Sequence, residues 1–170
     1  MFKEIKIEEM KFNPFTKIGK EWMLITAGTK ENFNTMTASW GFLGYLWERN
    51  VAAIFVRPTR YTYQFTEKHN TFTLTFFEEK YKEALKLCGT VSGRDTDKVK
   101  EAKLTPVFDN GYVYFEEAKL VLFCKKLYFD DLKSENFAIP SIEKFYPQKD
   151  YHRIYIGEIE SVARKSPERL

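Results

Sequence analysis

The segment "GYVYFEEAKLVLFCKKLYFDDL", residues 111–132, decides the fold class of this chain. It is rich in β-branched and aromatic residues, and the turn residues Asp109 and Asn110 stand immediately before Gly111 at its start. Its apolar runs and stretches of alternation predict a pair of long strands. We therefore expect a protein that is mainly β.

The same strand signal occurs in residues 21–29, 34–40, 51–57, 70–77 and 152–164. Helical spacing is confined to three places. Residues 78–89 give the clearest helix signal, and Gly89 is expected just after the C-terminus of that helix. A second helix is expected to begin with Asp95 or Thr96 as its N-cap. A third helix is expected after Pro58. Strands and helices do not alternate regularly, which argues against a parallel doubly wound sheet. A closed or nearly closed antiparallel barrel is predicted, because closure removes exposed strand edges, and a sandwich is the structural alternative.

Composition and charge describe an ordinary globular chain. Its 170 residues, 44% of them hydrophobic, suffice for a single domain covering residues 1–170. Lys and Arg number 27 against 24 Asp and Glu, and this interspersed net charge of +3 gives no support for a nucleic-acid partner. Cys88 and Cys124 form neither a disulfide framework nor a zinc pattern, so we expect no metal site and a reducing, cytoplasmic location. The sequence shows no signal peptide and no membrane segment.

Several familiar catalytic and nucleotide-binding motifs are missing. The eight glycines nowhere form the G-x-G-x-x-G pattern of a Rossmann domain or the G-x-x-x-x-G-K-[ST] pattern of a P-loop. Ser39 lacks the first glycine of a nucleophile elbow, and the chain has only two histidines, which argues against a serine hydrolase. Any phosphate must therefore be held in another way.

The stretch "NFNTMTASWGFLG", residues 32–44, is unusually polar for a strand end. Alternation puts threonine and serine on one face and Asn34, Met36, Ala38 and Trp40 on the other. Small side chains let a ligand come close to backbone groups, and a tryptophan followed by glycine can border a flat ring. The alternative is that the threonines are simply good strand formers and Trp40 a core residue.

Two further segments could bind an anion. Arg57 and Arg60 flank Pro58, and arginine forks match phosphate oxygens; the alternative is a surface loop with solvated arginines. Ser92, Gly93 and Arg94 precede a helix start, where Lys98 could reach the same charge; the alternative is that Asp95 caps the helix while Lys98 faces water.

The two histidines receive different interpretations. His152 stands at the entrance to the last strand, where its imidazole could donate to a ring carbonyl or a nicotinamide amide, although a lone histidine can equally be structural. Gly157, inside the same strand, indicates close approach of a ligand or of another backbone. His69, in the turn "KHNT", is expected to be exposed to solvent and to have no role.

Four segments occur in a characteristic order: "NxMTASWGxxG", "RPTRYT", "LCGTxSGRDxDK" and "YHRIYIGEIE". Together they resemble the flavin reductase-like, FMN-binding split-barrel family, and in particular its flavoredoxin-type members. The similarity covers residues 10–163. It implies a six-stranded antiparallel split β-barrel with Greek-key connections, which forms a homodimer and holds FMN at the dimer interface.

The resemblance also implies roles for individual residues. Those expected along the isoalloxazine ring and ribityl chain of FMN are Asn34, Met36, Thr37, Ala38, Ser39 and Trp40. Those expected near the FMN phosphate are Arg57, Arg60, Tyr61, Thr62, Ser92, Gly93, Arg94 and Lys98, with the partner subunit as an alternative source of the last four. His152 corresponds to a catalytic histidine near the ring and the nicotinamide pocket. No substrate residue can be transferred from residues 133–151, because this segment varies among related chains.

The function implied by the resemblance is that of an NADH- or NADPH-dependent flavin reductase, which moves a hydride to N5 of FMN and electrons onward to another flavin, a redox partner protein or another acceptor. Two alternatives stay open. One is a flavoredoxin-type electron carrier without nicotinamide turnover, and the other is a non-enzymatic flavin-binding protein.

Overall fold

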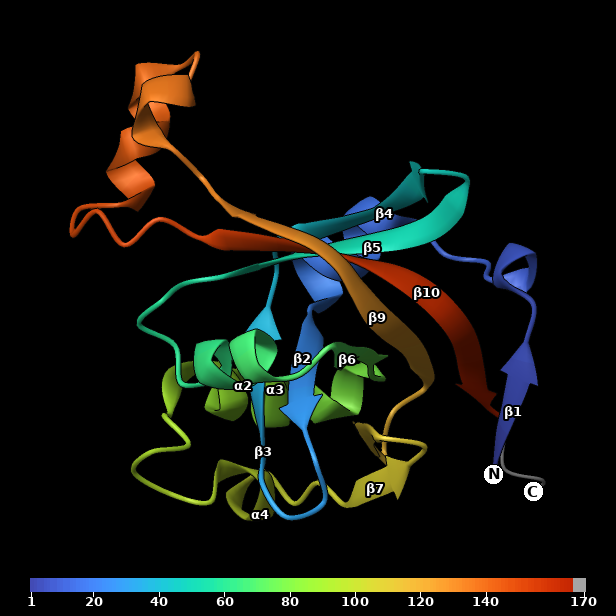
Figure 1. Ribbon diagram of the computed structural model, residues 1–170. Helices are drawn as coiled ribbons and strands as arrows, with labels where there is room; N and C mark the ends of the chain where they lie inside the picture. Colours follow the sequence, from blue (N-terminus) through green and yellow to red (C-terminus); the bar gives the residue numbers. More distant parts are fainter. Residues whose placement is uncertain (167–170) are drawn as a thin grey trace.

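The computed structural model describes residues 1–166, and most of them surround one antiparallel sheet (Figure 1). Along the sheet the strands follow the order β3 (Phe33–Ala38), β2 (Met23–Gly28), β6 (Thr71–Phe76), β9 (Leu120–Asp131), β10 (Arg153–Lys165), β5 (Arg49–Val56) and β4 (Gly41–Leu46), while β1 (Phe2–Ile5) pairs with β10. A separate hairpin consists of β7 (Pro106–Asp109) and β8 (Tyr112–Phe115). The expectation of a mainly β, antiparallel protein is confirmed. The sheet has eight strands instead of six, because β1 and β4 lie outside the segments predicted from the sequence.

The two longest strands join the halves of the sheet. β9 has 12 residues and β10 has 13, and both curve through the molecule in Figure 1. The start of β9 pairs with β6, whereas the start of β10 pairs with β5. Register shifts between Ile156 and Gly157 and between Ile159 and Ser161 interrupt their mutual pairing. Such irregularities bend a strand and increase its twist, which lets one strand pair serve two layers.

Helices cover one side of the sheet. The main ones are α2 (Thr62–Lys68), α3 (Lys82–Thr90) and α4 (Lys98–Glu101), and both α2 and α3 contact β2 and β3. The other helical segments are η1 (Ile7–Glu9), α1 (Pro14–Thr16), η2 (Lys17–Glu21), η3 (Glu79–Tyr81), η4 (Ser134–Asn136) and η5 (Pro140–Phe145). The last two belong to residues 133–151, here called the arm, which projects from the body between β9 and β10 (Figure 1).

Two helix boundaries differ from those predicted. Gly89 lies inside α3, because Val91 still donates to Leu87 O and has an extended conformation that needs no glycine. The α4 N-cap is Asp97, whose side chain accepts from Lys100 N, and neither Asp95 nor Thr96 takes that position. An N-cap side chain accepts from the N–H two or three residues further on, so the choice among nearby acids depends on where the turn starts.

The core has two parts. One fills the space inside the curved sheet and includes the fully buried Ile54, Leu74 and Tyr155. The other lies between the sheet, α3 and the β7–β8 hairpin and includes Leu85 and Phe115. Buried threonines bond locally; for example, the hydroxyl groups of Thr26 and Thr35 lie 2.8 Å apart across β2 and β3. The polar strand residues are thus accommodated without facing solvent.

Within residues 1–166, none of the helices combines the length and the apolar composition needed to cross a bilayer. In the same residues, no group of three or more His, Cys, Asp or Glu side chains is arranged to hold a metal ion. Cys88 and Cys124 are both buried and unpaired.

Candidate functional site

A pocket of about 210 Å³ opens where β3 ends, beside the last residues of β5 and the start of β10. Its lining residues are Met36, Thr37, Ala38, Ser39, Trp40, Phe55, Arg57, Arg60 and His152. All of these except Phe55 are among the site residues predicted from the sequence. The tertiary structure therefore brings together segments that are more than a hundred residues apart in the chain, and we call this cavity the strand-end pocket.

The wall formed by residues 36–40 has a free backbone edge. β3 stands at the end of the sheet and pairs only with β2 among the described strands, so half of its backbone N–H and C=O groups point away from any ladder. Ser39 and Trp40 lie between β3 and β4 and belong to neither. Thr37 donates its hydroxyl to Leu85 O and so ties this wall to α3.

Trp40 is not a core residue. Its side chain is 44% exposed, and its ring packs against the rings of Phe145 and His152 at centroid distances of 5.5 and 5.1 Å. The core interpretation of Trp40 is therefore wrong, because the chain leaves the sheet at Ser39 and carries the indole to the pocket rim.

Arg57 forms hydrogen bonds with residues of the arm. Its guanidinium donates to Asp150 Oδ2 and to Phe145 O, both at 2.8 Å, and lies 5.0 Å from the ring centroid of Tyr146. This hydrogen bond lowers the pKa of Asp150. The alternative of a solvated surface arginine is wrong, since both terminal nitrogens of the side chain are engaged. Arg57 thus holds the arm against one wall of the strand-end pocket.

Arg60 and Lys98 meet at the C-terminus of α3. Arg60 Nη1 donates to Gly89 O at 2.8 Å, and Lys98 Nζ donates to Cys88 O and Val91 O, both at 3.2 Å. Carbonyl groups at a helix C-terminus carry partial negative charge and favour such cations. Within residues 1–166, neither side chain forms an ion pair with a carboxylate.

Both cations are desolvated. Lys98 is only 3% exposed, so the alternative in which it faces water is wrong. Burial lowers the pKa of Lys98 to about 8, with a smaller contribution in the same direction from Arg60. Burial also lowers the pKa of Arg60, and the neighbouring Arg57 adds to the effect. One buried and one half-buried positive charge, neither of them paired with an acidic side chain among residues 1–166, favour a site that an anion can enter.

Most of the remaining predicted residues line a second, larger pocket of about 380 Å³, formed by Asn32, Phe33, Asn34, Tyr61, Gly93, Arg94, Asp95, Thr96, Asp97, Lys98 and Val99. Asn34 donates to Thr62 Oγ1 at 2.7 Å, and a Cβ at Gly93 would come within 2.2 Å of Asn34 Oδ1. Arg94 lies over the ring of Tyr61 at 4.8 Å. The structure therefore divides the predicted residues between two pockets, and Thr62 and Ser92 line neither. Ser92 instead accepts from Arg94 N at 3.2 Å.

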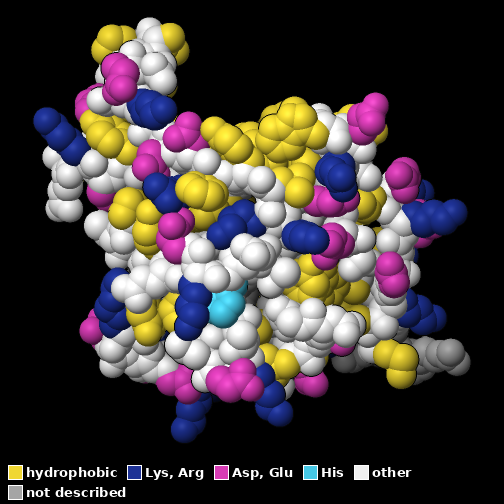
Figure 2. Space-filling model, in the orientation of Figure 1, with side chains coloured by type: hydrophobic (Ala, Val, Ile, Leu, Met, Phe, Trp, Pro, Cys, Tyr) yellow, Lys and Arg dark blue, Asp and Glu magenta, His cyan; other side chains and the backbone are white. Residues whose placement is uncertain are grey.

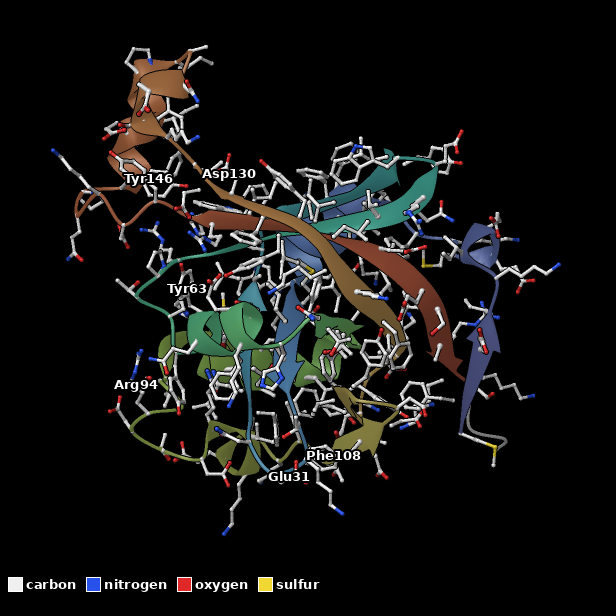
Figure 3. The ribbon with its side chains drawn as sticks, viewed as in Figure 1. Glu31, Tyr63, Arg94, Phe108, Asp130 and Tyr146 are labelled. Atoms are coloured by element: carbon white, nitrogen blue, oxygen red, sulfur yellow. The ribbon has the colours of Figure 1, made fainter. Side chains whose placement is uncertain are left out.

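His152 is held by a residue that sequence reasoning missed. Tyr146 Oη and His152 Nδ1 lie 2.8 Å apart, and the two side chains are 4% and 7% exposed. Burial, with a smaller contribution from Arg57, lowers the pKa of His152 to about 4, so its imidazole is neutral near pH 7. Tyr146 belongs to the aromatic arm, and no spacing in the sequence indicates which histidine it contacts. Figure 3 shows Tyr146 at the base of the arm, far from Arg94 beside the second pocket.

The two remaining sequence expectations for this region need correction. His69 is partly buried where full exposure was expected, because it follows α2 and packs beside the sheet end; it lines neither pocket. Gly157 lines neither pocket. A Cβ at this position would meet the ring of Phe72 and Cys124 Cβ in the core, so the close approach there is that of side chains.

Solved structures resemble the whole fold. A flavoredoxin from Methanosarcina acetivorans superposes with a TM-score of 0.67 at 18% identity, covering 99% of this chain and 78% of that one. A split-barrel domain protein from Shewanella frigidimarina gives 0.68 at 16% identity, with 87% and 68% covered. An NADH:FAD oxidoreductase from Streptomyces globisporus, solved in complex with NAD and FAD fragments, gives 0.64 at 18% identity, with 88% and 77% covered. At these identities the likeness shows the fold, which is a split barrel.

The comparison with curated proteins yields no match. The family model described as "Flavin reductase like domain" matches residues 15–169, which is nearly the whole chain and includes both pockets. The resemblance noted in the sequence is thereby confirmed, and this chain belongs to the flavin reductase like domain family.

Proposed function

We propose that this protein binds FMN and acts as a flavin reductase, which takes a hydride from NADH or NADPH and passes electrons to an acceptor. The observation that supports this most directly is the strand-end pocket, which we call the flavin pocket from here on. In it an unpaired strand edge, an aromatic rim and a half-buried guanidinium meet at one strand end. Membership of the flavin reductase like domain family supports the same function.

The chemistry of the pocket fits a flavin ring. An isoalloxazine presents carbonyl oxygens, ring nitrogens and two flat apolar faces. The unpaired edge of residues 36–40 offers both backbone donors and acceptors, and its small side chains permit close contact. Trp40 and Phe55 supply aromatic surface for the ring. We therefore propose Asn34, Met36, Thr37, Ala38, Ser39 and Trp40 as the residues along the ring and ribityl chain.

Arg60 and Lys98 have the charge and the position to attract the phosphate group of FMN. A phosphate would offset the desolvation of Arg60 and Lys98, and charge-assisted hydrogen bonds of this kind are about twice as strong as neutral ones. We propose that Arg60 and Lys98 provide the main attraction, with Arg57, Tyr61, Thr62, Ser92, Gly93 and Arg94 completing the region. The ion pair of Arg57 with Asp150 reduces its availability to a ligand.

The bound flavin would supply the redox chemistry, accepting a hydride at N5 and releasing electrons. The chain itself orients the ring, excludes water and provides hydrogen bonds at fixed positions. His152, which is neutral and lines the pocket, can donate a hydrogen bond to a carbonyl of the ring or of nicotinamide.

A second copy of the chain would cover a large apolar face. Exposed aromatic and aliphatic side chains gather on β4 and β9, namely Phe42, Tyr45, Leu46, Leu127, Tyr128 and Phe129, together with Trp47 in the β4–β5 turn. Figure 2 shows apolar side chains collected over β4 and β5 at the top of that view. Large apolar side chains left exposed in such number indicate an interaction site. We propose a cytoplasmic homodimer in which residues 1–170 form one flavin-binding domain and the partner completes the pocket.

Visible absorption spectroscopy tests the proposal. The purified protein, incubated with FMN and freed of excess, should show the absorption bands of bound flavin, and anaerobic NADH or NADPH should bleach them. A protein that stays colourless after incubation with FMN would contradict flavin binding.

A flavoredoxin-type electron carrier is the second candidate. The arm favours it, because Phe145 packs against Trp40 at the pocket rim, where nicotinamide would have to enter. Steady-state oxidation of NADH and NADPH with excess free FMN separates the two functions. Turnover supports the reductase, whereas bound flavin that dithionite reduces but nicotinamides do not supports the carrier.

A further inference from the structure

The contact between Tyr146 and His152 determines which ring nitrogen of His152 carries the proton. The two rings lie 5.5 Å apart at 79°, in an edge-to-face arrangement, with the hydroxyl 2.8 Å from Nδ1. A neutral imidazole carries one N–H, and the partner of one nitrogen decides which of the two is protonated.

The hydroxyl of Tyr146 has one hydrogen-bond partner among residues 1–166, which is His152 Nδ1. If Nδ1 carried the proton, the tyrosine would accept and its own O–H would be left without an acceptor in a side chain that is only 4% exposed. An unsatisfied buried donor is costly. The arrangement that satisfies both groups has Tyr146 donating to Nδ1 and the imidazole proton on Nε2.

The protonation states agree with this arrangement. Burial raises the pKa of Tyr146, so the phenol keeps its proton. The imidazole is neutral because its pKa lies at about 4. The charged groups that face His152 are Arg57, from the end of β5, and Asp150, from the arm, and their effects on its pKa oppose one another.

The second ring nitrogen faces the flavin pocket. The two nitrogens of an imidazole point in different directions, so Nε2 is turned away from Tyr146. In residues 1–166 Nε2 has no hydrogen-bond partner, and the one buried side-chain nitrogen or oxygen without a partner there is Asp150 Oδ1. Nε2 is therefore not sealed in the core, and His152 lines the pocket.

We propose that Tyr146 is a positioning residue, which fixes His152 as the Nε2–H tautomer and so presents a neutral hydrogen-bond donor to the pocket. The ligand atom that faces His152 must then be an acceptor, such as a carbonyl oxygen. Arg57 contributes indirectly, since its bonds to Asp150 and to Phe145 O hold the arm that carries Tyr146. The consequence for turnover rests on the proposed function, but the tautomer itself does not.

Nitrogen NMR tests the tautomer directly. Long-range ¹H–¹⁵N spectra of the full chain at pH 7 distinguish the two tautomers by their ring nitrogen shifts. The chain has two histidines, so a His69→Gln variant assigns the signals. We expect wild-type His152 as the Nε2–H tautomer. A wild-type spectrum showing the Nδ1–H form would overturn the proposal without any variant being needed.

Tyr146→Phe removes the hydroxyl and keeps the ring. His152 should then become a mixture of tautomers, because its nitrogens no longer differ in hydrogen bonding. Tyr151→Phe is the matched control: its ring lies 5.0 Å from that of Tyr146, but its hydroxyl donates to Glu143. We expect the control to resemble wild type. Unchanged nitrogen shifts in Tyr146→Phe, or equal changes in both variants, would refute the role of Tyr146.

These spectra need no flavin, so their outcome is separate from that of the absorption test. If FMN is bound and reduced by nicotinamide, Tyr146→Phe should also lower kcat/KM for NADH or NADPH about tenfold, which corresponds to the loss of one oriented hydrogen bond. Tyr151→Phe should leave kcat/KM near the wild-type value. A change in the tautomer with unaltered kcat/KM would show that the donor is not used in turnover and would overturn that part of the proposal.

Discussion

Gly157 of β10 lies directly against the ring of Phe72 on β6: a Cβ at position 157 would come within 2.7 Å of Phe72 Cζ and 3.2 Å of Cys124 Cβ. The pair sits where the β9–β10 register shifts, between Ile156 and Gly157. The glycine is thus required by core packing inside the curved sheet, and it leaves room for an aromatic ring of which only 4% is exposed.

Gly157→Ala should therefore destabilise the protein. Inserting a methyl group into this packed position should lower the free energy of unfolding by about 1–3 kcal/mol, as overpacking typically does. Urea denaturation gives the value. Gly44→Ala is the control, because a Cβ at that strand position meets nothing within 4 Å. Equal denaturation midpoints for the two variants would contradict the packing argument.

Arg60→Ala should weaken the binding of FMN but not the binding of riboflavin. Loss of a charge-assisted hydrogen bond to the phosphate should cost about 1.5–3 kcal/mol, or roughly 10- to 150-fold in Kd. Fluorescence titration with each flavin measures both constants, and riboflavin, which lacks the phosphate, serves as the internal control. Arg49→Ala, whose side chain pairs with Glu158, controls for the loss of a positive charge elsewhere. Unchanged FMN affinity in Arg60→Ala would remove this residue from the phosphate site.

Trp40→Ala should alter the environment of the flavin while leaving the fold stable. The indole is 44% exposed at the pocket rim, so its removal opens the site without leaving a buried cavity. We expect bound-flavin fluorescence and FMN affinity to change and the denaturation midpoint to stay close to wild type. Phe15→Ala is the control, since that aromatic side chain is 85% exposed and lines neither pocket. A flavin spectrum identical to wild type would exclude Trp40 from the ring site.

Lys98 should make the free energy of unfolding depend on pH in the alkaline range. Its pKa falls from 10.5 in the unfolded chain to about 8 in the folded one. Between these values the unfolded state binds more protons than the native state, so this group makes stability rise with pH from about 8 toward 10.5. Below pH 8 Lys98 is protonated in both the folded and the unfolded state. The cost of burying its charge then opposes folding at its full size.

Lys98→Met should remove this contribution. The difference in unfolding free energy between Lys98→Met and wild type should favour the variant more at pH 7.5 than at pH 9.5, and comparing the two proteins cancels the other titrating groups. Denaturant unfolding at both pH values measures it. A difference that is constant with pH would mean that Lys98 titrates alike in the folded and unfolded states.

The sequence predicted strands correctly where the pattern of apolar residues lies within the strand itself. The apolar and alternating runs that became β2, β5, β6 and β10 carry their own evidence in neighbouring residues. β4 was missed because its turn into β5 has no glycine: Trp47 and Glu48 adopt positive φ values of 51° and 58° without the usual turn residues. The short β1 was missed because it depends on pairing with the distant β10.

The amino-acid sequence by itself determined the antiparallel β class, the family and the segments that line the strand-end pocket, because periodicity and the order of motifs are properties of the chain alone. The tertiary structure decided what each side chain does there. It buried Lys98 beside Arg60, paired Arg57 with Asp150, and placed Tyr146 on His152. Burial and hydrogen bonding depend on contacts between segments far apart in the chain, so no local pattern can specify them.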